Sequence, residues 1–313
     1  MKRQFVASLQ EGDTVNDYFL AVRKDVRDQS NGGKFLGMVF KDRTGEVGGI
    51  LWTNAVAVAR LFEVGDVVNV RGTISSYQER LQIRVDQVVP IKETEYDPAD
   101  LVIAAENAED MLEQFRALLD TIKDEWLSKL VHAFLDDAEF MRRFAQSAAG
   151  KRWHHAYLGG LVRHCYEVAR LALAVCELFP AINKDLLLTG VFLHDIGKIE
   201  EMSQDLLVDY TTAGKLIGHV GLTAQMVGRK MDQIEGFPET LRLHVHHCIL
   251  SHHGELINGS PVVPKTIEAL VLYHCDNLDA QADAITRTIK ETRDKNVEWS
   301  DFLPLIERQI WAK

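Results

Sequence analysis

The sequence predicts two domains of different fold class, a small all-β barrel followed by a larger all-α domain. The chain has 313 residues, which exceeds the ~250 residues at which a single hydrophobic core usually stops growing. Residues 14–91 are rich in β-branched and aromatic residues, whereas helical spacing of apolar residues dominates from residue 108 onward. A polar, acidic stretch with Pro98 separates the two patterns. We therefore predict domains at residues 1–92 and 93–313.

The amino-terminal region is predicted to contain five strands and one helix. The Asp-Arg-Thr-Gly45 and Gly65-Asp66 segments have the composition of turns between strands. The expected strands are residues 15–26, 34–41, 47–52, 67–77 and 81–89, and the expected helix is residues 53–62. Three strands, a helix and two strands in this order resemble an OB-fold, a barrel whose surface binds oligonucleotides.

Aromatic and basic residues in this region predict a surface for single-stranded nucleic acid. Proteins that bind single strands combine aromatic faces, on which bases stack, with basic groups near the phosphates. The candidate residues are Phe35, Phe40, Lys41, Trp52, Tyr77, Arg80 and Arg84. For each aromatic residue taken singly, packing in the barrel core is the alternative.

The two predicted domains differ in charge. The whole chain has a formal net charge of −11, which at first argues against a nucleic-acid partner. Residues 1–90, however, hold 12 basic and 11 acidic side chains, whereas the remaining residues hold 23 and 35. The predicted barrel therefore lacks the negative charge of the rest. Metal-binding acids and a solvated helical surface would explain the acidity of the second domain.

Composition favours a cytoplasmic protein without membrane contact. No apolar run approaches the ~18 residues of a membrane span, and the first ten residues lack the apolar segment of a signal peptide. The four cysteines form no Cys-x-x-Cys pair, so we expect reduced and mostly buried thiols.

Helices are predicted almost without interruption after the linker. The expected ranges are residues 108–122, 125–135, 139–145, 161–178, 186–193, 219–231, 238–249, 266–284 and 300–311. In the range 186–193, seven of eight residues are apolar or glycine, so this helix should be buried on all sides. We expect Gly197 to end it in a left-handed conformation.

A histidine and a carboxylate, His194 and Asp195, directly follow this buried helix. Burying a carboxylate without a partner costs several kcal/mol. A divalent cation lets an adjacent imidazole and carboxylate point into a core together. The alternative for a His-Asp pair on its own is that it caps the end of a helix.

Other histidines and acids lie on or beside apolar helix faces. His164 borders the apolar stripe of its helix, and Asp276 lies on the stripe of residues 266–284. For His164 alone, a hydrogen-bonded core histidine is the alternative. Asp279 and Asp283 fall where their stripe turns polar, so we expect both to be solvated.

Four residues occur in the order His164, His194, Asp195 and Asp276. This order resembles the H…HD…D motif of the HD-domain metal phosphohydrolases. The additional histidines of members that bind two metals are matched by His219, His252 and His253. Lys198 stands where His-Asp-x-Gly-Lys members carry a lysine. With a barrel before them, the strings His-His-Ala-Tyr-Leu-Gly-Gly-Leu, His-Asp-Ile-Gly-Lys, Ser-His-His-Gly and Asp-Asn-Leu-Asp-Ala resemble the YhaM-type 3′→5′ exoribonucleases over nearly the full length.

The resemblance implies an enzyme that releases nucleoside 5′-monophosphates from the 3′ end of single-stranded RNA, and it leaves DNA open as a second substrate. Asp195 would bridge two divalent ions. The first ion would be completed by His164, His194 and Asp276, and the second by His219, His252 and His253. Imidazoles and carboxylates without thiolates suit Mn²⁺, Fe²⁺ or Co²⁺ and permit Zn²⁺ or Mg²⁺, with Mn²⁺ as the first candidate.

In this scheme Asp195 and Lys198 are the predicted catalytic residues. A water shared by two ions ~3.5–4 Å apart would become a hydroxide near neutral pH and attack phosphorus in line. Charge developing on the phosphate oxygens would be neutralised by Lys198, together with Lys151, Arg152 and His154.

Two alternatives stay open beside the exoribonuclease. One is an HD enzyme that acts on a small nucleotide and uses its barrel for regulation. The other is a single-strand binding protein whose metal site is structural. The sequence also leaves open the identity of the metal, the preference for RNA over DNA, and the formation of a homo-oligomer.

Overall fold

The structure is a computed structural model, and it describes residues 2–30, 32–78, 80–103, 107–151, 155–203, 205–304 and 306–313. The chain divides into two compact units. The first unit comprises Met1–Ile103 with Asp205–Leu207, and the second comprises Ala104–Gln204 with Val208–Lys313.

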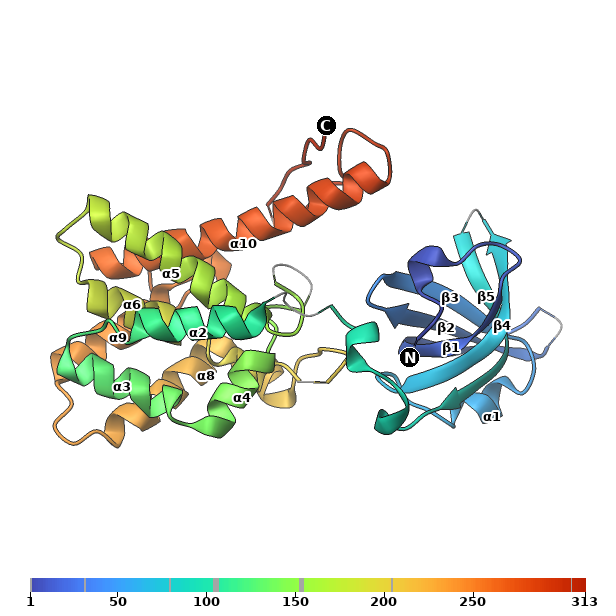
Figure 1. The fold of residues 1–313 in the computed structure, drawn as a ribbon, viewed down its shortest axis with the longest axis horizontal. Coiled ribbons are helices and arrows are strands. Elements are labelled where there is room, and N and C mark those ends of the chain that lie inside the picture. Colours follow the sequence, from blue (N-terminus) through green and yellow to red (C-terminus); the bar gives the residue numbers. More distant parts are fainter. Residues whose placement is uncertain are drawn as a thin grey trace. The chain divides into compact units, whose positions relative to one another are not determined.

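In the described residues of the first unit, five strands form a closed barrel (Figure 1). The strands are β1 (Thr14–Asp28), β2 (Lys34–Asp42), β3 (Gly45–Leu51), β4 (Val67–Tyr77) and β5 (Arg80–Pro90), and α1 (Ala55–Ala59) follows β3. Their order around the barrel is β1-β2-β3-β5-β4. Only β3 and β5 pair in parallel among these neighbours. The predicted all-β domain and its order of elements are confirmed.

Alternation along β2 decides which of its aromatic residues reach the barrel surface. Phe40 is fully buried, and its ring centroid lies 6.3 Å from that of Phe19 in the barrel core. Its neighbours Val39 and Lys41 are half-buried, because successive side chains of a strand point to opposite faces. The prediction that Phe40 stacks on nucleic-acid bases is therefore wrong.

The second unit is helical, as predicted (Figure 1). Its helices are α2 (Ala108–Leu119), α3 (Glu125–Leu135), α4 (Ala138–Gln146), α5 (Gly160–Leu178), α6 (Lys184–Leu193), α7 (Lys198–Glu201), α8 (Thr212–Asp232), α9 (Glu239–Ser251) and α10 (Ile267–Asp294). None of the helices in the described part of the chain combines the length and the apolar character that a membrane span requires.

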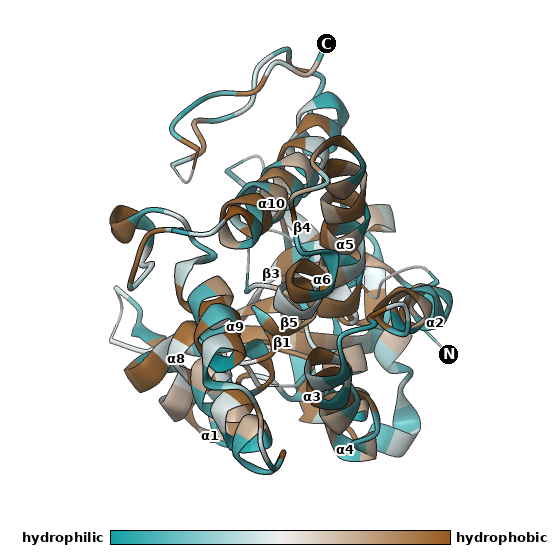
Figure 2. Cartoon of the chain, turned by 90° about the vertical axis from the view of Figure 1, so that its left-hand side faces the viewer, coloured by the Kyte–Doolittle hydropathy of each residue, from teal (hydrophilic) through white to brown (hydrophobic). Residues whose placement is uncertain are grey.

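Helix α6 is the centre of the helical unit. Asn183 caps it by accepting a hydrogen bond from Leu186 N at 3.1 Å. Every residue from Leu186 to Leu193 is buried, as the apolar run predicts. The helix contacts α3, α5, α9 and α10. Figure 2 shows apolar residues, coloured brown, gathering where α5, α6 and α10 meet. The end of α6 therefore delivers His194 and Asp195 into a core.

The prediction of a helix at residues 300–311 is wrong. The described part of this segment consists of turns and backbone without regular secondary structure, with isolated bridges from Trp299 to Trp311 and from Leu303 to Arg308. Pro304 lacks a backbone N–H and cannot continue a helical hydrogen-bond ladder.

The left-handed conformation expected at Gly197 is also wrong, since its φ and ψ are −63° and −16°. This position requires a glycine because the backbone of α8 packs too closely against it to leave room for a side chain. A Cβ atom would lie 2.3 Å from His219 O and 2.6 Å from Thr223 N, both in α8. Gly197 N also donates to Thr223 Oγ1 at 2.8 Å. The turn from α6 to α7 is thus packed directly on α8.

We expect Gly197→Ala to lower the free energy of unfolding of the helical unit by about 1–3 kcal/mol, because the added methyl overpacks this contact. Urea denaturation followed by circular dichroism at 222 nm measures the change. Gly228→Ala in α8 is the matched control, since the nearest atom to its added Cβ lies at 3.7 Å. The control should be neutral or stabilising by up to ~1 kcal/mol. Equal midpoints for the two variants would contradict the packing argument.

Candidate metal centre and nucleic-acid surface

The seven side chains predicted as metal ligands lie in one cluster within the second unit. They are His164 of α5, His194 and Asp195 after α6, His219 of α8, His252 and His253 after α9, and Asp276 of α10. Most of the cluster is shielded from solvent, and His164 and His194 are 0% exposed. Packing of separate helices therefore brings together residues that lie far apart in the sequence.

The first half of the cluster consists of His164, His194 and Asp276, and it faces Asp195 Oδ2. His164 Nε2 lies 3.1 Å from Asp276 Oδ1 and 3.5 Å from Asp195 Oδ2. His194 Nε2 lies 3.4 Å from the same Asp195 oxygen and 3.2 Å from His164 Nε2. Two imidazole nitrogens and two carboxylate oxygens thus converge on one point.

The second half consists of His219, His252 and His253, and it faces Asp195 Oδ1. His219 Nε2 and His252 Nε2 lie 3.4 and 3.6 Å from this oxygen. His253 Nε2 lies 3.2 Å from His219 Nε2. The two oxygens of Asp195 therefore face different halves of the cluster.

Four of the imidazoles present Nε2 to the cluster while Nδ1 has a partner behind the ring. These partners are Asp279 for His164 (2.6 Å), Val191 O for His194 (2.8 Å), Glu201 for His219 (3.0 Å) and Ile249 O for His252 (2.7 Å). An acceptor at Nδ1 holds the ring proton there, which leaves the Nε2 lone pair directed inward.

Electrostatics favour an ionised carboxylate at Asp195 and neutral rings at His252 and His253. Burial alone would raise the pKa of Asp195, but Lys198 and His194 hold it well below its usual range. Burial lowers the pKa of His252 well below normal and also lowers the pKa of His253. His164 differs, because hydrogen bonds to acids outweigh burial and raise its pKa to about 10. Binding of a cation at His164 Nε2 would therefore release a proton.

The donor set fits divalent cations. Asp195 Oδ1, His252 Nε2 and His253 Nδ1 are buried and have no hydrogen-bond partner among the described residues. Four carboxylates lie in or directly behind the cluster, namely Asp195, Asp276, Asp279 and Glu201. Lys198 Nζ, 2.5 Å from Asp195 Oδ2, and the protonated ring of His164 oppose these four negative charges with two positive charges. Buried negative charge in excess calls for cations, and imidazole with carboxylate ligands suits Mn²⁺, Fe²⁺ or Co²⁺.

Three acids near the cluster are not predicted correctly from the sequence. Asp279 and Asp283 are expected to be solvated, and Glu201 is not predicted as a functional residue. Asp279 is 6% exposed and lies behind His164, so the prediction that it is solvated is wrong. Asp283 is half-buried and accepts from His155 N at 2.9 Å, so it is not a solvated acid either. The sequence signal that could have found Asp279 is its spacing of three residues from Asp276 on one helix face. Glu201 carries no comparable signal, because its partner lies across a loop.

Three residues besides Lys198 are predicted to contact phosphate, and none of them is found in the cluster of metal ligands among the described residues. Lys151 Nζ pairs with Asp209 Oδ1 at 2.6 Å. Arg152 and His154 lie outside the described residues. A role for these three residues in phosphate binding stays a prediction, whereas Lys198 lies within the cluster.

On the barrel, most of the predicted nucleic-acid residues are accessible. Trp52 and Tyr77 are 50% and 62% exposed, and the rings of Phe35 and Trp52 lie 5.1 Å apart. Arg80 and Arg84 are exposed on β5. Lys41 on β2 is half-buried.

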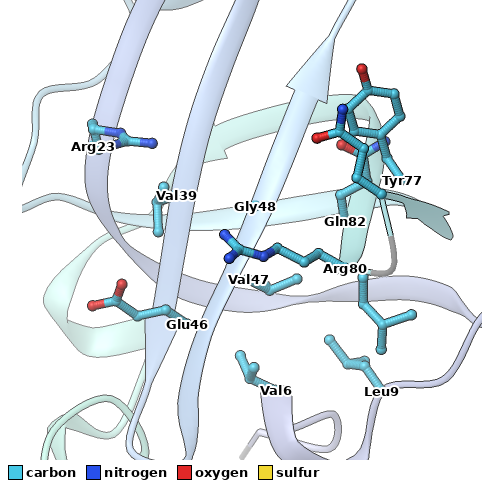
Figure 3. A pocket seen from close by; sticks show the side chains of 12 residues that line it. Val6, Leu9, Arg23, Val39, Glu46, Val47, Gly48, Tyr77, Arg80 and Gln82 are labelled. Atoms are coloured by element: carbon cyan, nitrogen blue, oxygen red, sulfur yellow. The ribbon is translucent and has the colours of Figure 1, made fainter. Parts of the chain in front are cut away.

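A groove of about 820 Å³ lies on the barrel (Figure 3). Tyr77 and Arg80, two of the residues predicted to bind nucleic acid, line this groove. Arg23 also lines it, although it is not among the predicted residues. Figure 3 shows the Arg80 side chain reaching towards Val47 and Gly48. Phe35, Phe40, Lys41, Trp52 and Arg84 do not line the groove.

Family models match both units. An OB-fold nucleic acid binding domain matches residues 21–91, and an HD domain matches residues 161–281. The HD match contains all seven side chains of the cluster. The barrel is therefore an OB-fold and the helical unit contains an HD domain, which confirms the predicted fold of each.

Solved structures show weaker similarities. The second OB-fold domain of replication protein A from Methanococcus maripaludis is 22% identical over 30% of this chain and 97% of that chain, with a TM-score of 0.25. The HD domain of the L. monocytogenes phosphodiesterase PgpH is 18% identical over 51% and 86%, with a TM-score of 0.30. Because both TM-scores are low, the two folds are assigned from the family models alone.

Proposed function

Because the chain joins an OB-fold nucleic-acid-binding domain to an HD domain, we propose that it is a metal-dependent 3′→5′ exoribonuclease. The HD domain indicates a metal-dependent phosphohydrolase, and the barrel indicates a nucleic-acid partner. Single-stranded RNA as the substrate, digestion from the 3′ end and nucleoside 5′-monophosphates as products belong to the proposal. The observation that carries it is Asp195, whose two oxygens face two separate sets of imidazole nitrogens.

Each half of the cluster is proposed to hold one divalent ion, with Mn²⁺ as the first candidate. Two such ions would supply positive charge and water activation for attack on a phosphodiester. Asp195 would be shared between them, because Oδ2 faces the first half and Oδ1 the second. Lys198 Nζ lies beside Asp195 Oδ2, where it would donate to an oxygen of the bound phosphate.

The barrel is proposed to hold the single strand. Its groove offers an aromatic face at Tyr77 and guanidinium groups at Arg23 and Arg80. Base stacking on an aromatic ring tolerates any sequence, which suits an enzyme that removes one nucleotide after another. The barrel region also lacks the net negative charge of the rest of the chain.

The proposal is tested with RNA and DNA oligonucleotides of one sequence, labelled at either end and incubated with the protein and Mn²⁺. We expect 5′-labelled RNA to shorten in single-nucleotide steps, and 3′-labelled RNA to release labelled mononucleotide at once. Internal fragments would contradict an exonuclease. Hydrolysis of small nucleotides with intact RNA would favour the small-nucleotide enzyme, and binding without hydrolysis would favour a single-strand binding protein.

Tyr77→Ala is expected to raise KM for an RNA oligonucleotide by about 5- to 150-fold, since stacking of one base is worth roughly 1–3 kcal/mol. Hydrolysis of bis(p-nitrophenyl) phosphate should not change, because this small diester does not need the barrel. Steady-state kinetics with both substrates measure whether KM for RNA rises while hydrolysis of the small diester stays unchanged. Phe302→Ala removes a similarly exposed aromatic ring, 59% exposed, from the other unit and should behave as wild type. An unchanged KM for Tyr77→Ala would remove Tyr77 from the nucleic-acid surface.

A further inference from the structure

Two carboxylates outside the seven predicted ligands reach the cluster from behind. Asp279 Oδ2 lies 2.6 Å from His164 Nδ1. Glu201 Oε1 lies 3.0 Å from His219 Nδ1 and also accepts from His219 N at 2.9 Å. One carboxylate therefore backs one imidazole in each half of the cluster.

The other backed imidazoles are held differently. His194 and His252 have Nδ1 against the carbonyls of Val191 and Ile249, each three residues earlier in the chain. Local helix geometry is sufficient to orient such a ring. His164 and His219 instead have Nδ1 against carboxylates that come from other helices, Asp279 of α10 and Glu201 of α7.

Asp279 is itself held in place. The same Oδ2 atom lies 2.9 Å from Nε2 of His155, which is fully buried. His155 Nδ1 lies 2.9 Å from Tyr157 Oη, and the His155 backbone has a φ of 43°, in the left-handed region. Backbone strain of this kind persists only where the surrounding structure enforces it. The surrounding structure therefore holds the His155 ring against Asp279.

Glu201 is also held by close backbone packing. A Cβ atom at Gly214 would lie 2.2 Å from Glu201 O. Gly218, with a φ of 75°, kinks α8 directly before His219. The kink lets the backbone N–H and the ring of His219 meet one carboxylate oxygen.

We propose that Asp279 and Glu201 are positioning residues, each of which orients one ligand imidazole in one half of the metal centre. The inference rests on the proposed metal-dependent function. Carboxylates behind metal-binding histidines fix the ring orientation and raise its basicity, and their loss weakens metal binding by about 10- to 100-fold. His155, His164 and Asp279 also lie close enough to hold an ion. Their separations of 2.6 and 2.9 Å, however, are those of hydrogen bonds.

The test is a titration of the metal-free full-length protein with Mn²⁺ alone, in which electron paramagnetic resonance reports the free ion. Wild type is expected to bind two ions. Asp279→Asn and Glu201→Gln should each weaken one of the two binding steps by about 10- to 100-fold and leave the other unchanged. At limiting Mn²⁺ the variants should show a lower kcat for bis(p-nitrophenyl) phosphate, and excess Mn²⁺ should restore most of it. A purely structural defect would not respond to Mn²⁺.

Matched controls come from the same helices. Asp294→Asn, at the C-terminal end of α10, removes an exposed carboxylate far along the helix from Asp279. Glu200→Gln in α7 removes a carboxylate that pairs with Arg143 at 2.6 Å. Both controls should bind two ions with wild-type affinity.

Several outcomes would overturn the inference. Wild-type Mn²⁺ affinity in both Asp279→Asn and Glu201→Gln would do so while leaving the proposed function intact. A third Mn²⁺ equivalent in wild type that disappears in Asp279→Asn would make Asp279 a ligand instead. If one variant does not fold, the other tests the same claim in the opposite half. A wild-type protein that neither binds Mn²⁺ nor hydrolyses a diester would instead refute the proposed function.

Discussion

Asp195→Asn is expected to abolish hydrolysis of both RNA and small phosphodiesters while leaving a folded protein. The carboxylate is the group whose two oxygens face both halves of the cluster. An amide offers one weak oxygen ligand and no charge, so both ions should be lost or displaced. Because each 1.36 kcal/mol is a factor of ten in rate and the charge of a metal ion is worth several kcal/mol, we expect a loss of roughly 10⁴-fold or more.

Elemental analysis alongside kinetics checks this expectation, because Mn²⁺ content should fall together with activity. Circular dichroism should show wild-type helix content. Asp232→Asn, whose carboxylate is 70% exposed and pairs with Arg242, is the matched control and should keep both metal and activity. An Asp195→Asn protein that retains both would exclude Asp195 from the metal centre.

His252→Ala should remove about one equivalent of Mn²⁺ and lower kcat by two or more orders of magnitude. Its Nε2 atom is buried, has no hydrogen-bond partner among the described residues, and lies 3.6 Å from Asp195 Oδ1. Loss of this ligand should empty the second half while the first half keeps His164, His194 and Asp276. The lost charge stabilisation of one ion accounts for the several kcal/mol that the rate loss represents.

Metal stoichiometry and single-turnover rates on an RNA oligonucleotide measure the effect. His244→Ala removes an exposed histidine from α9, the same helix, and serves as the control. If His252→Ala bound two ions and turned over at full rate, a structural role for the histidines of the second half would be the better explanation.

Much of the fold is predictable from the sequence, because it depends on local periodicity. The alternation of β-branched residues marks the five strands, and the apolar run before His194 marks the buried helix α6. Two of the errors have different causes. Phe40 is one residue from an outward position, so alternation in β2 buries it. Pro304 breaks the apolar spacing that predicts a helix at residues 300–311.

The sequence by itself determines the order of the histidines and acids and their positions on apolar helix faces. These two features make a buried metal centre predictable. The sequence cannot show which atom of each residue points inward, since the partners that decide this lie far along the chain. His164 takes its orientation from Asp279, which is 115 residues away. Likewise, only the packing of α6, α8 and α9 turns the two oxygens of Asp195 towards different halves. Local patterns arise from neighbours within a few residues, whereas these contacts exist only once separate helices close around a common core.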